Sequence, residues 1–334
     1  MSDRPLGWAL IGCGHVARGH AQSAVELADV EVRGFCDIRA DAAQEFHETY
    51  GGAYHTTDAE AIFSDPTVDL VCIATSHDSH ADLAIAALGA GKHLFLEKPM
   101  AMTTADCLRI YDAMNAADRK LMINLSIRFS GAAREIKKRL GVPKVSHGQC
   151  MQGHVDLTTW RWHPEQGGGP LYDVGVHAVD LLCWVHDSDP VEVYAVGGQV
   201  THPGQLGDAD LVDTAVATIR FANGSASTFL MSDAGFSEVV SKWFFEFFDG
   251  EQAAVLDHHF TRVTFTRPDG DTGNLVTEEL TPPPMERLPD LVAAIRHDAE
   301  PYIPVRAGIV STLLVEKITE SIQTRRPQAI EIPI

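Results

Sequence analysis

The chain has 334 residues, of which 45% are hydrophobic and 22% charged, and these ordinary values exclude a disordered or fibrous protein. A chain of this length is typical of about two domains. The net charge of -20, with no cluster of Lys and Arg, repels polyanions, so we expect no nucleic-acid partner.

Three further features bear on the compartment in which the protein works. Its first residues contain no basic segment followed by an apolar stretch, so we expect no signal peptide. No apolar run approaches the roughly 18–20 residues that a membrane helix needs, so we expect no membrane partner. The six cysteines are scattered without a CxxC pair, and this pattern predicts a reduced, cytoplasmic protein.

Strands alternate with helices over the first 125 residues. The expected elements, in chain order, are a strand at Leu6–Ile11, a helix near His15–Ala28, a strand at Val30–Cys36, a helix near Ala40–Tyr50, a strand at Leu70–Ala74, a helix near Ser79–Ala90, a strand at His93–Leu96, a helix at Thr103–Ala117 and a strand at Leu121–Leu125. Such alternation is typical of βαβ units. It predicts a Rossmann-type, doubly wound parallel sheet over residues 1–125.

From about residue 126 strands predominate. The expected strands are Val145–Gln152, Val191–Val200, Thr214–Phe221, Ser225–Met231, Trp243–Phe248 and Arg262–Thr266, and the expected helices are Gly131–Leu140, Val174–Val185, Glu286–His297 and Ala307–Thr324. Asn223-Gly224 and Asp249-Gly250 are strong signals of tight hairpins. Residues 126–334 are therefore predicted to form an α+β domain built on a large, mostly antiparallel sheet.

The first predicted strand runs into a glycine-rich turn, GCGHVA at residues 12–17, which then opens a helix. Gly12 permits the tight turn, Gly14 lets the backbone approach a pyrophosphate, and Ala17 is small enough for the helix to pack on the sheet. Amide groups at the start of the helix meet the phosphate charge. The turn predicts a dinucleotide site that also includes His15 and Val16.

Asp37 follows the second predicted strand, twenty residues after the turn, where a carboxylate can bind both ribose hydroxyls of an adenosine. The same carboxylate repels a 2′-phosphate, which favours NAD over NADP. Arg39, two residues further on, offsets part of that repulsion. The expected cofactor is therefore NAD, with NADP as the weaker alternative.

Two other segments carry candidate chemistry. Glu97-Lys98-Pro99 follows a predicted strand, which places Lys98 at the carboxyl edge of the sheet, where ligands bind in open α/β folds. In the second half of the chain, a glycine-rich segment enters a helix on which Asp173 and His177 are four residues apart and share one face.

These segments resemble the glucose–fructose oxidoreductase/inositol dehydrogenase family, also called Gfo/Idh/MocA, over essentially the whole chain. The matching features, in that family's order and spacing, are GCGHVA, Asp37, His80 before an Ala-Gly-Lys-His run, EKP at residues 97–99, Asn124, Arg128-Phe129, Trp160-Arg161 and GGGPLYDVGVHAVD at residues 167–180. The resemblance implies a Rossmann domain, an open-faced α/β domain whose sheet makes a dimer or tetramer, and a sugar, polyol or related substrate between the domains. It also implies a cis bond before Pro99. Ser76 departs from the pattern, since many members carry proline there.

The resemblance also assigns roles for hydride transfer between a nicotinamide and a secondary alcohol or ketone. His177 becomes the general acid/base, Lys98 the group that stabilises the developing alkoxide, and Asp173 a group that binds a substrate hydroxyl or orients the site. Which of Lys98 and His177 takes the proton stays open. The further expected contacts are Thr75, His80, Glu97 and Lys98 for the cofactor, and Asn124, Arg128, Trp160 and Arg161 for the substrate. Trp160–Trp162 can also be interpreted as a packed loop.

Other functions fit parts of the same pattern. Asp173, His177, Asp180 and His186 are potential metal ligands, but their spacing is loose and hydride transfer with a lysine needs no Lewis acid, so we expect no metal. A glycosidase or lyase that reduces NAD transiently is one alternative to a dehydrogenase. A non-catalytic dinucleotide sensor is another, although such a sensor would not need Lys98 and His177 together.

Overall fold

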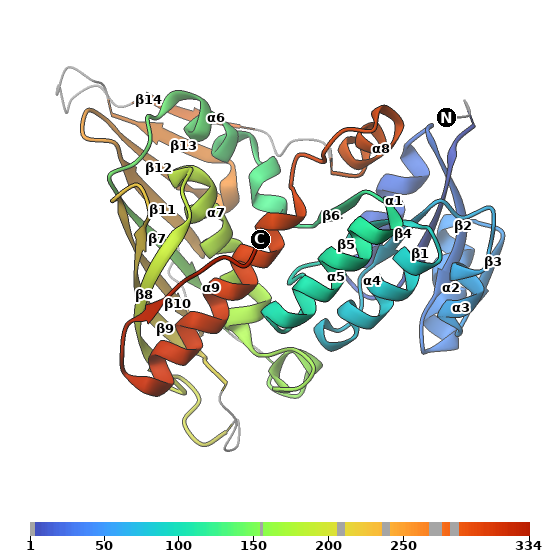
Figure 1. Cartoon of the computed structure of the whole chain (residues 1–334), viewed down its shortest axis with the longest axis horizontal. Coiled ribbons are helices and arrows are strands. Elements are labelled where there is room, and N and C mark those ends of the chain that lie inside the picture. Colours follow the sequence, from blue (N-terminus) through green and yellow to red (C-terminus); the bar gives the residue numbers. More distant parts are fainter. Residues whose placement is uncertain (1–3, 154–155, 206–210, 236–240, 267–275, 281–286) are drawn as a thin grey trace. The chain divides into compact units, whose positions relative to one another are not determined.

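Two sheets organise the chain in its computed structural model, which describes residues 4–153, 156–205, 211–235, 241–266, 276–280 and 287–334 (Figure 1). Each sheet belongs to a unit with its own internal contacts. The first unit comprises Met1–Asn124 and Met285–Ile309, and the second comprises Leu125–Pro284 and Val310–Ile334. No helix in the described part of the chain is long and apolar enough to cross a membrane.

The division differs from the single boundary expected near residue 125, because residues 285–309 return to the first unit. They include helix α8 (Arg287–His297), whose expected first residue, Glu286, lies outside the described residues. The helix buries Leu288, Leu291 and Ile295 and contacts α1 (Ala17–Glu26) and β5 (His93–Leu96). An apolar stripe predicts that a helix packs, but it does not specify on which sheet.

The first unit is the predicted doubly wound sheet. Its strands, all parallel, are in the order β3-β2-β1-β4-β5-β6. Besides α1, α8 and β5, its elements are β1 (Leu6–Ile11), β2 (Val30–Cys36), α2 (Ala40–Tyr50), β3 (Tyr54–Thr56), α3 (Ala59–Phe63), β4 (Leu70–Ile73), α4 (His80–Gly89), α5 (Thr104–Ala117) and β6 (Leu121–Ile123). β3 and α3 were not predicted, because elements of three and five residues are too short to show a periodic pattern.

The register of this sheet brings the ends of its strands together. Ile11, the last residue of β1, pairs with Cys36 at the end of β2 and with Ile73 at the end of β4. Ile73 pairs with Leu96, which pairs with Ile123 at the end of β6. The residues that follow each strand therefore emerge at one edge, and the strand order reverses there between β1 and β4, the position at which open α/β sheets bind ligands.

The second unit contains a nine-stranded sheet in the order β14-β13-β12-β11-β7-β10-β9-β8-β15, with only the β7–β10 pair parallel. Its elements are α6 (Gly131–Arg139), β7 (Val145–Met151), α7 (Val176–His186), β8 (Pro190–Gly198), β9 (Thr214–Phe221), β10 (Ala226–Ser232), β11 (Trp243–Phe248), β12 (Ala253–Asp257), β13 (Arg262–Phe265), β14 (Val276–Glu279), most of α9 (Val305–Thr324) and β15 (Gln328–Ala329). The large, mostly antiparallel sheet is as predicted. The short strands β12, β14 and β15 were not foreseen.

The two faces of this sheet differ. Helix α7 packs on β7 and β10, α6 packs on β12 and β13, and no described helix of the unit covers the other face (Figure 1). Strand β11 shows the alternation, since Phe245 and Phe247 are fully buried whereas Phe244 and Phe248 face the open side. The cluster of four phenylalanines thus divides into core residues and residues of an open face.

This division predicts unequal effects for two neighbouring substitutions. Phe245→Ala is expected to lower the free energy of unfolding by about 3–5 kcal/mol, because it empties a closely packed site. Phe244→Ala, on the open face, is expected to cost clearly less. Urea unfolding followed by circular dichroism measures both, and equal losses would contradict the assignment of the two faces.

Candidate functional site

The turn between β1 and α1 has the shape that a dinucleotide requires. Gly12 has a φ of +95°, and an added Cβ would lie 2.5 Å from the carbonyl oxygen of Ala74, so only glycine fits. At Gly14, by contrast, an added Cβ would meet no atom within 4 Å, so its backbone faces open space. Ala17 is fully buried, and no side chain caps the N-terminus of α1. His15 and Val16 are exposed, and backbone amides at the start of a helix suit an anion.

Asp37 lies against this turn. Its Oδ2 accepts a hydrogen bond of 2.8 Å from the backbone N–H of Cys13, and its Oδ1 accepts one of 2.9 Å from that of Arg39. The Arg39 Nε lies 3.6 Å from the same Oδ1, while the side chain of Arg39 remains 63% exposed. The carboxylate is thus fixed at the end of β2, and each oxygen keeps a lone pair for a ribose hydroxyl.

The segment after β4 supports this edge mainly from within the protein. Thr75 is half-buried, with its Oγ1 2.7 Å from the Oγ of Ser79. His80 is fully buried, and its Nδ1 lies 2.8 Å from the carbonyl oxygen of Pro99; burial lowers the pKa of this imidazole. His80 therefore holds the loop that carries Lys98, and the bond before Pro99 is cis, as expected. Ser76 has a φ of -68°, the value that proline would impose.

Glu97 forms the centre of a buried network beside Lys98. Its Oε1 lies 2.6 Å from the Nε2 of His20 and accepts a 2.6 Å hydrogen bond from the Nδ2 of Asn124. Its Oε2 lies 3.2 Å from the backbone nitrogen of Lys98. Burial by itself raises the pKa of this carboxyl, but hydrogen bonds from His20 and Asn124 and the charge of Lys98 outweigh it and lower the pKa to about 2. The carboxylate is therefore ionised at neutral pH.

Asn124 is placed differently from the substrate contact that the resemblance implied. It is 4% exposed, and while its Nδ2 bonds Glu97, its Oδ1 accepts a 3.2 Å hydrogen bond from the Nη1 of Arg287. His20 and Arg287 were not among the predicted site residues. His20 could have been found, because it shares the buried face of α1 with Ala17 and Ala21. Arg287 carries no motif.

In the second unit, the structure brings three of the predicted site residues together. The Nε of Arg161 lies 3.3 Å from Oδ2 of Asp173, and the Arg161 guanidinium lies 4.7 Å from the ring centre of Trp160. The loop closes tightly, since an added Cβ at Gly167 would lie 2.4 Å from the Cα of Arg161. Trp160 and Arg161 are only partly buried, whereas Trp162 is buried, so the loop both packs and presents side chains.

Asp173 and His177 lie on two kinds of helix. Residues Leu171–Gly175 form a π-helical turn, and α7 begins after it at Val176. Such wide turns are frequent at functional sites. His177 is half-buried. Its ring packs edge-on against that of Trp243, with 6.3 Å between the ring centroids. The helix expected from Val174 thus starts with a wider turn that includes Asp173.

Arg128 belongs to a buried ion pair. Its Nε and Nη2 bond the two carboxylate oxygens of Asp180 at 2.9 and 2.5 Å, and both side chains are buried. His186, also buried, lies 2.7 Å from the Oγ of Ser146 and 2.8 Å from the Oγ of Ser225. Asp180 and His186 thus have partners away from Asp173. Within the described ranges, no three His, Cys, Asp or Glu side chains gather in a way that could hold a metal.

Comparisons with known proteins agree with this geometry. The family model of the oxidoreductase family with an NAD-binding Rossmann fold (GFO_IDH_MocA) matches residues 6–125, and the model of the GFO/IDH/MocA C-terminal domain matches residues 133–238. A 1,5-anhydro-D-fructose reductase of Ensifer adhaerens is 31% identical over 66% of this chain and 68% of its own length. A myo-inositol 2-dehydrogenase of Thermotoga maritima is 26% identical over 96% of this chain and 98% of its own length.

A solved structure shares the fold. Levoglucosan dehydrogenase in complex with NADH superposes with a TM-score of 0.87 at 22% sequence identity, covering 98% of this chain and 100% of that one. The two matching domain models, the related sequences and the shared fold together cover nearly the whole chain. The chain therefore belongs to the Gfo/Idh/MocA family of oxidoreductases, with an NAD-binding Rossmann domain at its N-terminus.

Proposed function

We propose that the protein is an NAD-dependent dehydrogenase that acts on a secondary alcohol or ketone of a sugar, inositol or related polyol. The observation that carries the proposal is the convergence of the Gly12 turn, Asp37 and the Glu97-Lys98 segment at one edge of the sheet. The substrate class is supported by the relatives, a 1,5-anhydro-D-fructose reductase and inositol dehydrogenases.

The first unit fits the dinucleotide. The open backbone at Gly14 and the uncapped N-terminus of α1 suit the pyrophosphate, and Asp37 suits the adenosine ribose. Thr75 and Lys98 follow β4 and β5 at the same edge. When bound, the nicotinamide supplies the acceptor or donor of the hydride.

The protein's own residues handle the proton and the charge. In the proposed mechanism, Lys98 donates a hydrogen bond to the reacting oxygen and stabilises its developing negative charge. His177 takes the proton during oxidation and returns it during reduction, with Lys98 as the other candidate for this step. Asp173, paired with Arg161, binds a substrate hydroxyl, and the ring of Trp160 offers an apolar surface for a sugar.

A panel of sugars, inositols and sugar acids, assayed with NAD and NADP at 340 nm, tests this function. Steady formation of NADH with a polyol is the expected result. Substrate cleavage without net NADH would favour the glycosidase or lyase. Dinucleotide binding without turnover of any panel member would favour the sensor.

We also propose that the open face of the second sheet makes a homo-oligomer. Apolar side chains are exposed there: Val196 on β8 is 51% exposed and pairs directly with Val216 on β9, which is 48% exposed. Tyr194 lies two residues from Val196 on β8, and Val145 and Phe248 form a second exposed apolar pair on β7 and β11. Apolar side chains exposed on one face of a sheet favour a protein contact. The six cysteines, all thiols in the structure, support a reduced, cytoplasmic location.

Cofactor preference is expected to follow Asp37. The protein should show a higher kcat/KM with NAD than with NADP, and Asp37→Ser should narrow that ratio about tenfold, equivalent to about 1.4 kcal/mol of relieved repulsion. Asp41→Ser, which removes an equal charge from the exposed first turn of α2, is the control and should leave the ratio unchanged. Equal or better use of NADP by the unmodified protein would contradict the assignment.

The reacting pair should be essential to turnover. Lys98→Met and His177→Ala are each expected to lower kcat by roughly 10²–10⁴-fold, the usual contribution of positioned proton-transfer and charge-stabilising groups. Calorimetry should show nearly unchanged NAD affinity, since Gly12–Ala17 and Asp37 hold the dinucleotide. The double variant should lose less than the product of the single losses. Near-full kcat in both single variants would show that the motif is structural.

The oligomer prediction uses a matched pair of valines. Val216→Asp, on the open face, is expected to dissociate the protein into smaller species in analytical ultracentrifugation, because it buries a charge in the contact. Val142→Asp should not, because Val142 is 53% exposed but lies outside the sheet. An unmodified protein that sediments as a monomer would refute the proposed contact.

A further inference from the structure

Lys98 follows Glu97, a buried carboxylate that a series of hydrogen-bonded side chains holds in place. Its backbone nitrogen lies 3.2 Å from Oε2 of Glu97, while Oε1 of Glu97 is bound by Asn124 and His20. A buried carboxylate is costly unless donors surround it, so the loss of any donor has a large effect. The position of Glu97 therefore depends on whichever groups orient its donors.

Arg287 orients one of those donors. The side-chain amide of Asn124 has an oxygen end and a nitrogen end, and only its nitrogen can donate to Glu97. Arg287 carries donors alone, and its Nη1 lies 3.2 Å from Oδ1 of Asn124. A flipped amide would set two donors against each other and an oxygen against the carboxylate. Arg287 thus fixes the amide in the orientation that serves Glu97.

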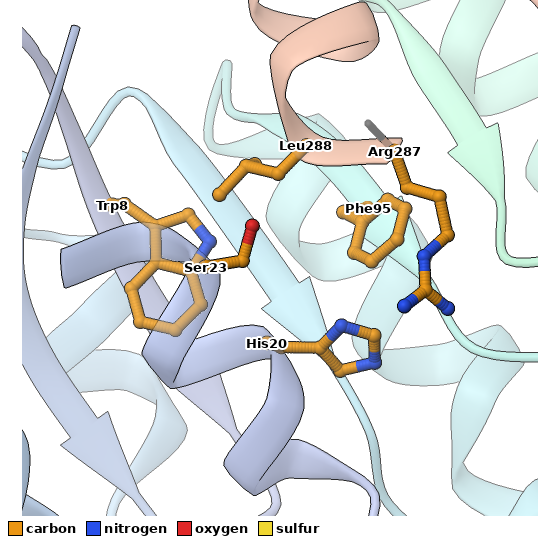
Figure 2. Close-up of a pocket in the computed structure, with 6 residues that line it drawn as sticks. All are labelled: Trp8, His20, Ser23, Phe95, Arg287 and Leu288. Atoms are coloured by element: carbon orange, nitrogen blue, oxygen red, sulfur yellow. The ribbon is translucent and has the colours of Figure 1, made fainter. Parts of the chain in front are cut away.

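The cavity beside Arg287 is too small for a sugar or polyol. Figure 2 shows Arg287 and His20 at a small cavity that Trp8, Ser23, Phe95 and Leu288 also line. The cavity measures about 10 Å³, roughly what one water molecule needs. Burial lowers the pKa of Arg287, and the negative charge of Glu97 opposes this effect. The influence of Arg287 is therefore exerted through contacts inside the protein.

We propose that Arg287 is a positioning residue for the reaction: it locks the amide of Asn124, which holds Glu97, which in turn holds the backbone of Lys98. This inference rests on the proposed function, because it gives Lys98 the role described above. It gives a task to Asn124 and Arg287, two residues of the first unit. In the sequence, one precedes and the other follows the segment Leu125–Pro284 of the second unit.

The competing explanation is that Arg287 merely anchors α8. The same helix offers a matched control in Arg296, whose Nη2 bonds the carbonyl oxygen of Arg4 at 3.1 Å and the Oδ1 of Asp29 at 3.3 Å. Arg296→Met removes an anchoring arginine of the same helix without touching Asn124. Arg287→Lys restores one donor and is the conservative variant.

Turnover of the best substrate of the polyol panel is the first measurement. Arg287→Met is expected to lower kcat about tenfold or more, as is usual for groups that orient a reacting residue, with NAD affinity unchanged. Arg287→Lys should recover most of the loss, and Arg296→Met should stay within about twofold of the unmodified protein. Adding Arg287→Met to Asn124→Leu should cause no further loss, because the chain is already broken.

The second measurement needs no substrate. The pKa of Glu97 is lowered to about 2, so its ionised form stabilises the fold at pH values above about 4.5, and this stability is lost as the pH falls toward 2. Arg287→Met weakens a donor to that form. The difference in unfolding free energy from the unmodified protein should thus be large at pH 7 and shrink toward pH 3. The difference for Arg296→Met should stay nearly constant.

The two measurements separate the possible failures. If Arg287→Met matches Arg296→Met in both kcat and pH dependence, Arg287 only anchors α8 and the inference is wrong. If no polyol is turned over by the unmodified protein, the proposed function fails. The pH-dependent unfolding still decides whether Arg287 supports Glu97 through Asn124, and a constant difference there overturns the inference by itself.

Discussion

The backbones of Gly12 and Ala74 approach each other closely, and this contact sets the spacing of β1 and β4 at the edge of the sheet that is proposed to bind the cofactor. Gly12 has no Cβ, which allows its backbone to lie against the Ala74 carbonyl while its N–H bonds the carbonyl of Cys36. Any larger residue would push β4 away from β1 and separate Thr75 from the turn. Because Asp37 bonds Cys13 in the same turn, the residues proposed to bind the ribose and the pyrophosphate depend on one arrangement of the backbone.

The second constraint is electrostatic. Glu97 is buried beside the candidate catalytic lysine and stays ionised because His20 and Asn124 donate to it. Losing one donor from a buried charge costs more than the net value of one hydrogen bond. Loss of one donor therefore strongly destabilises the whole network. Because the donors hold Glu97 in place, the segment that continues into Lys98 is rigid. A rigid segment suits a group that must meet a reacting oxygen at a defined distance.

In the second unit, side chains that alternate along each strand give the sheet two different faces. One face of its sheet packs under α6 and α7, and α7 begins just after the π-helical turn that contains Asp173. The other face exposes Val196 and Val216. A strand with period two necessarily presents both faces, so the residues that build the core also set the composition of the open surface. The buried Arg128–Asp180 pair ties the start of this unit to α7.

The main strands and helices of both sheets were predictable from the sequence, as were the Gly12 turn, Asp37 at the end of β2 and Lys98 at the end of β5, because each follows from local periodicity or from turn chemistry. The sequence also located the segments that hold Asp173 and His177. The packing of α8 on the first sheet, and the bonds from Asn124 and Arg128 to buried carboxylates, became clear only from the folded chain. A side chain's type determines which hydrogen-bond donors and acceptors it carries, but long-range packing determines which partner lies beside it.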